Sequence, residues 1–394
     1  MDNQTADIKV AIFATHPIQY QVPWFRALAG AAGIRLKVYY ALLPDENQQG
    51  VGFNVPFQWD IPMLEGYPWE VLPNDSRSPN LGRFFGANTP GVATALSRDR
   101  PDIAIITGWQ SWSLVQALVA CIRMGIPRLI RAESNALHKR PWWLGMIHRA
   151  LLSSFDGFLE IGRANREFYL GNGAASSRIF PCHYFVDNDR IRAQFESYVA
   201  ERESLRAVWG IPPDSVCFLF VGKIQEKKRP MDLLRAVMLA KTSNPNIHVL
   251  VAGSGELLEE AQKWVEREGL PVTFAGFLNQ TELPKAYAAG DCLVLPSDYG
   301  ETWGLVVNEA MVCGLPAIVS DRVGCGPDLV QDGATGAVAP FGDIEGLACR
   351  MVEFASDKPR LVEMGVRARN RVAEYSVGRA VEGTIQGIRA VLGR

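Results

Sequence analysis

Short apolar runs alternate with longer amphipathic segments along the first half of the chain. An uninterrupted apolar run is typical of a strand buried on both faces of a parallel sheet, and a longer segment with helical periodicity is typical of a covering helix. Together these patterns predict a parallel sheet with helices on both faces. The predicted strands cover residues 10–14, 36–42, 103–107 and 129–132, and the predicted helices cover residues 24–32 and 113–124.

The second half of the chain repeats the same pattern. Because 394 residues exceed one ordinary hydrophobic core, this repetition on either side of a midpoint near residue 190 predicts two α/β domains. The predicted strands are 217–221, 247–252, 272–274, 292–295 and 317–320, and the predicted helices are 231–241, 256–268, 283–289, 303–313, 344–354, 358–375 and 377–392.

Composition and charge exclude several classes of protein. Hydrophobic residues make up 48% of the chain and charged residues 21%, which is typical of a globular protein. The formal net charge of -2 gives no support to a nucleic-acid partner. Seven cysteines without CxxC pairs predict buried free thiols in a reducing cytoplasm. The polar N-terminus predicts no signal peptide, and no apolar stretch reaches the ~18 residues that a membrane span needs.

The segment 296–316, PSDYGETWGLVVNEAMVCGLP, carries the clearest chemistry. Pro296 ends an apolar strand, a polar loop carries Glu301, and a predicted helix over 303–313 carries Glu309. A helix that begins directly after a strand points its free N–H groups into the crevice where ligands bind, which favours an anion. The two carboxylates are too far apart for a close acid/base pair and would reach hydroxyls on different parts of one ligand. The alternative is a solvated loop glutamate and a glutamate on the polar face of a helix.

A second segment, VGKIQEKKRP over residues 221–230, indicates phosphate binding. Gly222 at the end of a strand lets the backbone approach a ligand, and Lys223 and Lys228 can bring two ammonium groups to one diphosphate. The alternative is a solvated charge run at a helix start, although cations there are unfavourable without an anion.

Segment 296–316 resembles the signature of glycosyltransferase family 4, within the glycogen-synthase-like superfamily of glycosyl transferases group 1. The resemblance implies the GT-B fold: two Rossmann-like, doubly wound parallel-sheet domains that face a central cleft, with the last helix crossing back to the first domain. The expected ranges are 1–188 for the acceptor-binding domain, 189–375 for the nucleotide-sugar-binding domain and 376–394 for the returning helix. Residues 44–60 form an irregular connection that we expect to lie over the cleft.

The resemblance also implies roles for residues of the second domain. Glu301 is expected to lie against hydroxyls of the donor sugar and Glu309 to bind the nucleotide ribose. The family pattern here is a glycine, an arginine and a later lysine. Lys228 matches the lysine, and Lys223 replaces the arginine. A lysine keeps the positive charge but cannot form the two parallel hydrogen bonds of a guanidinium. Further donor contacts are expected from Gly222, Gly253, Phe277 and Leu278 and from the backbone of Thr302, Trp303, Gly304 and Leu305. For Phe277 and Leu278, core packing is an equal alternative.

The first domain departs further from the family. Where many members have a glycine-rich first loop, this chain has bulkier residues, and His16, Gln19 and Tyr20 are predicted to contact the acceptor. For His16, a capped loop histidine without a ligand is an equal alternative. Aligned on the strand at 129–132, Glu133 occupies the position of the usual histidine, and His138 follows five residues later. Glu133 is therefore a predicted catalytic residue beside Glu301, Lys223 and Lys228. Either Glu133 or His138 replaces the family histidine, and Arg131 could instead pair with Glu133 as a structural ion pair.

No metal or other cofactor is expected. The triplet at 187–189, Asp-Asn-Asp, imitates the metal-binding motif of another glycosyltransferase fold, but its place in the crossover predicts a helix cap. Without a metal, the two lysines and the helix start must neutralise the leaving diphosphate.

Residues 138–149, HKRPWWLGMIHR, combine two tryptophans with basic residues. Such a stretch can bind an anionic membrane surface, which would suit a lipid-linked acceptor. The more ordinary interpretation is a helix that packs on the domain and has a solvated basic end.

The resemblance implies a cytoplasmic enzyme, peripheral to the membrane if that stretch binds lipid, that transfers a sugar from a nucleotide diphosphate to a hydroxyl acceptor. It implies retention of anomeric configuration and a role in cell-surface polysaccharide or glycoconjugate synthesis. The alternatives are a noncatalytic sugar-nucleotide-binding partner subunit, a nucleotide-sugar epimerase and a phosphorylase. The sugar, the base and the acceptor are not specified by these motifs.

Overall fold

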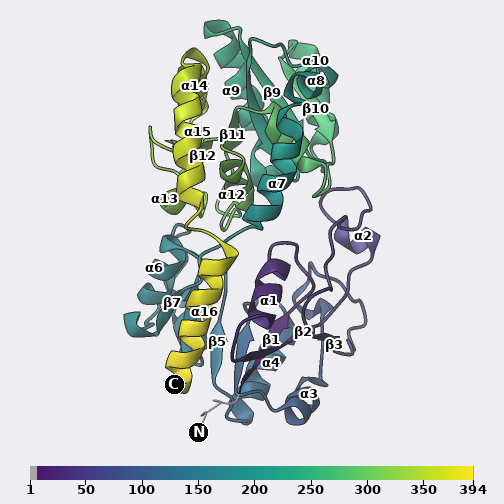
Figure 1. Cartoon of the computed structure of the whole chain (residues 1–394), viewed down its shortest axis with the longest axis vertical. Coiled ribbons are helices and arrows are strands. Elements are labelled where there is room, and N and C mark those ends of the chain that lie inside the picture. The colour runs from purple at the N-terminus through teal and green to yellow at the C-terminus, as the bar shows by residue number, and fades with distance from the viewer. Residues whose placement is uncertain (1–6, 394) are drawn as a thin grey trace. The chain divides into compact units, whose positions relative to one another are not determined.

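The structure, a computed structural model, describes residues 7–393 and divides into two compact units. Unit 1 comprises residues 7–49, 62–184 and 377–393, and unit 2 comprises residues 50–61 and 185–376. Each unit has its own sheet and its own hydrophobic core, with helices flanking the sheet (Figure 1).

Unit 1 is built on a seven-stranded sheet in the order β3-β2-β1-β4-β5-β6-β7, in which all neighbouring strands are parallel. The order starts in the middle, runs to one edge and then returns to run to the other, as in a doubly wound fold. The strands are β1 (Ile8–Ala14), β2 (Ile34–Tyr40), β3 (Trp69–Val71), β4 (Ile103–Ile106), β5 (Arg128–Ile130), β6 (Gly157–Glu160) and β7 (Ile179–Pro181).

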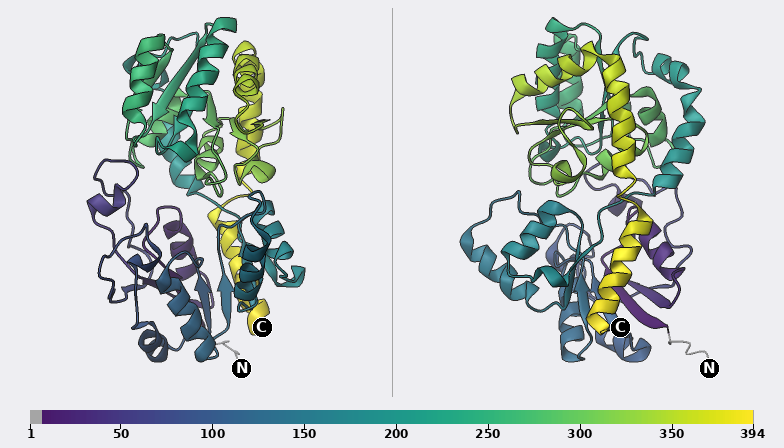
Figure 2. Two further views of the ribbon diagram at one scale, coloured as in Figure 1. Left: turned by 180° about the vertical axis from the view of Figure 1, so that it is seen from behind. Right: turned by 60° about the vertical axis from the view of Figure 1, so that its left-hand side comes forward.

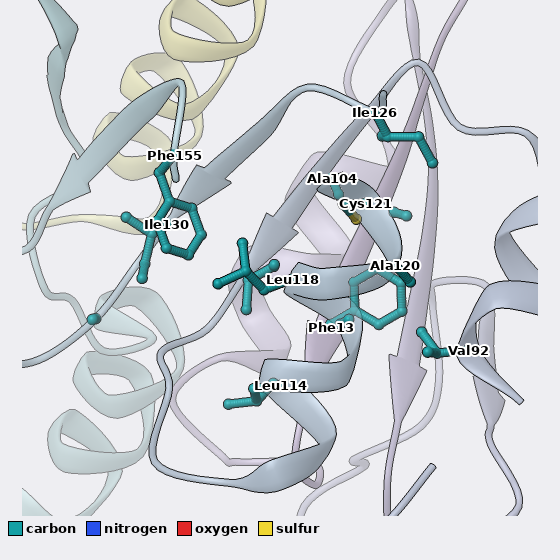
Figure 3. Close-up of a cluster of buried hydrophobic side chains, with 14 of the residues drawn as sticks. Phe13, Val92, Ala104, Leu114, Leu118, Ala120, Cys121, Ile126, Ile130 and Phe155 are labelled. Carbon is teal, nitrogen blue, oxygen red and sulfur yellow. The ribbon is translucent and has the colours of Figure 1, made fainter. Parts of the chain in front are cut away.

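Helices cover the sheet of unit 1 and bury its apolar strands. Phe13 of the central strand, Leu118 and Cys121 of a covering helix and Phe155 belong to one cluster of buried side chains (Figure 3). The helices are α1 (Val22–Ala29), α2 (Glu46–Gln49), α3 (Val92–Asp99), α4 (Trp112–Arg123), α5 (Trp142–Leu152), α6 (Arg163–Gly171) and α16 (Val377–Leu392), with short 3-10 turns η1 (Phe84–Gly86) and η2 (Ser176–Arg178).

The C-terminal helix α16 belongs to unit 1, where it packs against α1, β6 and β7 (Figure 2). Gly383 makes this approach possible, since a Cβ there would lie 1.5 Å from the carbonyl oxygen of Pro181. The buried hydroxyl of Thr384 accepts a 3.2 Å hydrogen bond from the Trp24 indole. The last element of the chain is therefore part of the core of the first unit.

Unit 2 is built on a six-stranded parallel sheet in the order β10-β9-β8-β11-β12-β13. The strands are β8 (Val216–Val221), β9 (Ile247–Ala252), β10 (Val272–Gly276), β11 (Cys292–Leu295), β12 (Ala317–Ser320) and β13 (Gly336–Ala339). The helices are α7 (Asn188–Val199), α8 (Arg202–Val208), α9 (Pro230–Ser243), α10 (Leu258–Glu268), α11 (Leu283–Ala289), α12 (Leu305–Val312), α13 (Gly326–Leu329), α14 (Ile344–Ser356) and α15 (Lys358–Val372), with the turn η3 (Glu226–Lys228).

Two Rossmann-like parallel-sheet units confirm the predicted fold class. The predicted domain ranges differ from the units mainly at residues 50–61, which were assigned to the first domain and cluster instead with unit 2. The two boundaries also shift slightly, because residues 185–188 and residue 376 cluster with unit 2. The helix predicted at 303–313 begins at Leu305, since Gly304 has a left-handed φ of 102° that interrupts the helical backbone.

The cysteine prediction needs one correction. All seven cysteines are free and six are buried, but Cys349 on α14 is exposed. The same helix buries Leu347, Ala348, Met351, Phe354 and Ala355. Among residues 7–393, no helix is both long and apolar enough to cross a membrane.

Candidate functional site

The site of unit 2 lies at the carboxyl ends of β8 and β11, which are neighbours in the sheet although they are not consecutive in the chain. The strand order reverses between them, and this switch point is where open α/β sheets bind ligands. The loops after the two strands carry the two motifs that the sequence singled out, at 222–228 and 296–304.

The loop before α12 is held rigidly. A Cβ on Gly304 would lie 3.0 Å from Leu295, so both its φ and the space around it favour glycine. The buried Trp303 side chain donates a 2.8 Å hydrogen bond from its indole to the buried Asn308. Trp303 thus fixes the loop through its side chain, and only its backbone is available to a ligand. The chain from Leu305 onward is helical and presents unpaired N–H groups at its start.

Lys228 and Glu301, predicted separately from two motifs, form an ion pair. The Lys228 ammonium donates to one carboxylate oxygen of Glu301, which also accepts from the Ser297 hydroxyl at 3.4 Å. Their side chains are only 11% and 14% exposed. Neither residue fits the alternative of a solvated surface charge. A buried ion pair contributes little net stability to a fold, but removal of one partner is costly because it leaves an uncompensated charge.

Glu309 lies in the second turn of α12 and is 1% exposed. Its carboxylate accepts a 2.7 Å hydrogen bond from the Tyr287 hydroxyl of α11. The alternative that placed Glu309 on a polar helix face is therefore wrong. A buried carboxylate is costly without partners, so the fold maintains this group in a fixed position.

Two glycine turns bring β8 and β9 close together at the same edge. Gly222 donates from its N–H to Ala252, and Gly253 donates to Gly276 at 2.7 Å. A Cβ on Gly253 would lie 1.9 Å from the Gly222 carbonyl oxygen. The sequence predicted that Gly222 and Gly253 contact the donor. The structure shows that their two turns pack against each other, and a Cβ on Gly222 would lie 3.7 Å from the Lys228 side chain.

Lys223 has a different partner from Lys228. Its ammonium donates a 2.7 Å hydrogen bond to the carbonyl oxygen of Val51 and lies 5.0 Å from the centre of the Phe53 ring. Burial lowers the pKa of Lys223, and the charges of Lys227 and Lys228 lower it further. The two lysines predicted to hold one diphosphate therefore have different partners. Lys228 pairs with Glu301, and Lys223 contacts residues 50–61, a segment that we call the strap.

The strap also covers the predicted base contact. Phe57 is buried, and its ring centre lies 4.4 Å from that of Phe277, while the Phe53 ring meets Phe277 at 5.1 Å in an edge arrangement. The Asn279 side chain donates a 2.7 Å hydrogen bond to the Gln58 carbonyl oxygen, and the Thr281 backbone amide donates a 3.1 Å hydrogen bond to the Asp60 carboxylate. These strap residues were not among the predicted site residues, although residues 44–60 were recognised as an irregular connection. The signal available was the cluster of aromatic residues within an otherwise irregular segment, at positions 53, 57 and 59.

The predicted acceptor residues lie in unit 1 at the carboxyl ends of β1 and β5, on the same edge of the sheet with β4 between them. The Nδ1 atom of His16 lies 2.9 Å from the Thr15 hydroxyl, within hydrogen-bonding distance. Burial lowers the pKa of His16 to about 4, so its side chain is neutral at pH 7. Gln19 and Tyr20 lie half-buried in the turn before α1.

Glu133 is exposed and accepts a hydrogen bond from the Tyr184 hydroxyl. The guanidinium of Arg131 lies 4.6 Å over the Tyr184 ring, so Arg131, Tyr184 and Glu133 form one connected group. Burial raises the pKa of Tyr184, and the Glu133 charge raises it further. His138 is exposed and its carbonyl oxygen accepts from Arg140. The structure thus gives Glu133 a defined position and leaves the His138 side chain at the surface.

Asp187 caps α7, since its carboxylate accepts a 3.1 Å hydrogen bond from the Arg190 amide. This confirms the predicted helix cap. Within the described part of the chain, no group of three or more His, Cys, Asp or Glu side chains is placed to hold a metal ion.

The fold and this edge of unit 2 define a class: a GT-B-type pair of doubly wound units with a basic and acidic site at the switch point of the second. Comparison with known proteins agrees. Residues 201–371 match the family "Glycosyl transferases group 1". The resemblance stated from the motifs is confirmed at this level; membership of family 4 stays a prediction.

Individual relatives share part of the chain. Sulfoquinovosyl transferase SQD2 of Arabidopsis thaliana is 27% identical over 73% of this chain and 56% of its own length. A D-inositol 3-phosphate glycosyltransferase of Mycolicibacterium smegmatis is 36% identical over 48% of this chain and 42% of its own length. The chain spans about half the length of these relatives.

Among solved structures, the Anabaena protein HepE in complex with UDP and glucose superimposes with a TM-score of 0.72 at 16% identity, covering 97% of this chain and 100% of HepE. At this identity the likeness shows the fold alone, and it covers both units.

Proposed function

We propose that this protein is a glycosyltransferase that moves a sugar from a nucleotide diphosphate sugar to a hydroxyl acceptor. The single observation that supports this best is the buried Lys228–Glu301 ion pair beside the start of α12, within a glycosyl transferases group 1 domain. In this proposal the diphosphate lies at the helix start, where backbone N–H groups and the Lys228 ammonium stabilise the charge that develops as the sugar leaves.

Glu301 would then accept hydrogen bonds from donor-sugar hydroxyls, and Glu309, oriented by Tyr287, would accept from the ribose. We further propose retention of configuration by a front-face route, in which the departing phosphate oxygen takes the proton of the acceptor hydroxyl. Lys223 would join the diphosphate once its hydrogen bond to Val51 is released. The acceptor would contact His16, Gln19, Tyr20, Glu133 and His138 of unit 1.

Uridine diphosphate sugars are the first donors to test, because the fold likeness includes HepE with UDP and glucose. Inositol phosphate and sulfoquinovose-related acceptors or donors follow from the names of the sequence relatives. We also propose that transfer is independent of a metal and other cofactors, that the enzyme is cytoplasmic, as free cysteines favour, and that it serves cell-surface polysaccharide or glycoconjugate synthesis.

A thermal-shift panel of nucleoside diphosphates and their sugars tests the donor site. A bound nucleotide at 100 times its dissociation constant should add roughly 2.7 kcal/mol to the free energy of unfolding. The best donor is then incubated with an acceptor panel, with and without EDTA, and the anomeric configuration of any product is read by NMR. Glu309→Gln, which keeps the size of the side chain, should weaken donor binding while Tyr287→Phe weakens it less.

The alternatives give different results in the same experiment. A noncatalytic subunit would bind nucleotide sugar without transferring or hydrolysing it. An epimerase would convert the donor without an acceptor, and a phosphorylase of the cofactor-dependent kind would show pyridoxal absorbance. No stabilisation by any nucleotide or nucleotide sugar would contradict the proposal.

A further inference from the structure

Helix α5 of unit 1 presents an apolar outer face. Trp142 is 77% exposed, Trp143 48%, Met146 57% and Ile147 54%. The spacing pairs Trp142 with Met146 and Trp143 with Ile147 along neighbouring rows of the helix. A surface helix ordinarily turns polar residues outward, so four large apolar side chains on the exposed face of one short helix require an explanation.

The helix is firmly held by its other side. The His148 ring lies 5.8 Å from the Trp109 ring and 5.2 Å from the Phe168 ring of α6. Leu151 packs against the core of unit 1, and Leu152 is fully buried. The exposed face is therefore a fixed surface of a packed helix. This packing agrees with the ordinary interpretation, which does not account for the four exposed apolar side chains.

Basic residues accompany this face in the sequence. Lys139 and Arg140 immediately precede the helix, Arg149 lies within it, and the stretch from 134 to 155 contains no acidic residue. Arg140 is anchored by hydrogen bonds to the carbonyl oxygens of Asn135 and His138 and lies 5.2 Å from the Phe168 ring.

Lys139 and Arg149 are exposed and have no ion-pair partner among residues 7–393. The neighbouring helix α6 adds one exposed acid, Glu167, and the basic residues Arg163 and Arg166, of which Arg166 is paired with Glu160 at 3.3 Å.

We propose that the outer face of α5 binds the surface of an anionic lipid bilayer. Tryptophan favours the interface between headgroups and acyl chains, and basic residues are attracted to anionic headgroups. With 11 residues the helix is far too short to span a bilayer, so it would lie in the plane of the interface. The helix offers both exposed aromatic side chains and basic side chains without ion-pair partners in the part of the chain that the structure describes. This combination favours an anionic lipid surface over an uncharged protein partner.

Vesicle cosedimentation of the full chain tests the proposal without requiring any enzymatic activity. Vesicles of phosphatidylcholine with added phosphatidylglycerol should retain the protein, and pure phosphatidylcholine vesicles should retain much less. Raising the salt concentration should weaken the binding, because the attraction of exposed charges is screened beyond about 10 Å at 0.1 M.

Two sets of variants separate the apolar and the charged contributions. Trp142→Ala with Trp143→Ala should lower the partition coefficient on the order of 100-fold on anionic vesicles. Lys139→Gln and Arg149→Gln should each lower it about 5-fold on anionic vesicles and leave binding to neutral vesicles unchanged.

The matched controls lie on unit 2. Val362 and Val366 of α15 are 69% and 58% exposed, and Lys263 of α10 is an exposed base, so Val362→Ala with Val366→Ala, and Lys263→Gln, should leave vesicle binding unchanged. All the changed side chains are exposed, so each variant should melt close to the wild-type temperature.

Several results would overturn the proposal. The first is a wild-type protein that stays in the supernatant with anionic vesicles at low salt. The second is binding that survives the double tryptophan variant. The third is a sedimentation-velocity experiment in which that variant converts a dimer to a monomer without any change in lipid binding, which would make this face a contact between two copies of the chain.

Discussion

At the scale of single residues, the ion pair between Lys228 and Glu301 joins two loops that are 73 positions apart in the chain. Neither side chain is solvated enough for the pair to be an ordinary surface salt bridge, and neither can lose its partner without leaving a charge poorly compensated. A diphosphate arriving at the start of α12 would provide Lys228 with a second anion. In the proposed function, the pair would hold the ammonium in place before the ligand binds.

Lys228→Ala should therefore lower turnover by on the order of 100-fold, comparable to the loss of one preorganised donor to a developing charge. Steady-state transfer with the best donor measures this. The neighbouring Lys227→Ala is the matched control, because Lys227 is exposed and should be dispensable. Lys228→Arg keeps the charge and the partner, and its folding can be compared by thermal melting. Unchanged turnover in a folded Lys228→Ala variant would remove this residue from the mechanism.

A second residue-scale prediction concerns His248, which is buried in β9 and meets the Thr273 hydroxyl at 3.0 Å. Burial, together with the smaller effect of the Arg206 charge, lowers its pKa to about 4. In the unfolded chain the pKa of this histidine is near 6.5. Between pH 6.5 and pH 4 the unfolded state therefore binds a proton that the folded state does not, and the free energy of unfolding falls as the pH drops. This one group should cost up to roughly 2 kcal/mol of unfolding free energy between pH 7 and pH 5.

Thermal or urea unfolding at pH 7 and pH 5 measures that slope. His248→Gln keeps a hydrogen-bonding group near Thr273 but does not titrate, so it should flatten the pH dependence over this range. If the wild type and this variant lose stability equally between the two pH values, the histidine is not responsible.

Single-residue chemistry was the part of the site that could be predicted best from sequence. The charges of Lys228 and Glu301 and the glycines at strand ends are local signals. The pairing of Lys228 with Glu301 could not be predicted from local sequence, because it depends on β8 and β11 lying side by side in the sheet. The burial of Glu309 could not be foreseen either, since the residues around α12 come from α11 and other elements.

At the scale of elements, the close approach of α16 to β7 depends on a helix position with no side chain. Gly383→Ala would place a Cβ 1.5 Å from the Pro181 carbonyl oxygen, a backbone atom that cannot move aside cheaply. We expect a loss of about 3 kcal/mol in the unfolding free energy of unit 1, in the range of overpacked core sites.

Gly378→Ala, in the same helix, is the matched comparison because a Cβ there meets nothing within 4 Å. Alanine is a better helix former than glycine, so this variant should gain up to about 1 kcal/mol. Urea unfolding followed by circular dichroism measures both. Equal effects from the two variants would mean that α16 does not need its close contact with β7.

The elements themselves were predictable where apolar runs are bounded by glycine or proline. The strands at 247–252 and 292–295 and the helix at 283–289 match their predicted ranges. The edge strand β3 was missed because it has three residues and is only half-buried, and β13 because its residues are small. The strap was recognised as irregular but not as part of unit 2, since its packing on Phe277 leaves no periodic signal in its own sequence.

At the scale of the whole molecule, each unit buries a core of its own, so each can open separately from the other. The predicted donor residues, from Gly222 to Glu309, all belong to unit 2, and the predicted acceptor residues all belong to unit 1. A ligand that binds one native unit stabilises that unit by mass action, so binding at one unit should leave the stability of the other unchanged.

A saturating nucleoside diphosphate should therefore slow hydrogen exchange in the core of unit 2 selectively. At 100 times the dissociation constant, the slowest amides of β8, β9 and β11 should exchange about 100-fold more slowly, whereas those of β1 and β4 should be unchanged. Mass spectrometry of peptic fragments reads both units in one experiment, and Glu309→Gln should reduce the effect at equal ligand concentration. Equal protection of both cores would mean that the units open together, and the donor site could then not be assigned to unit 2 by this measurement.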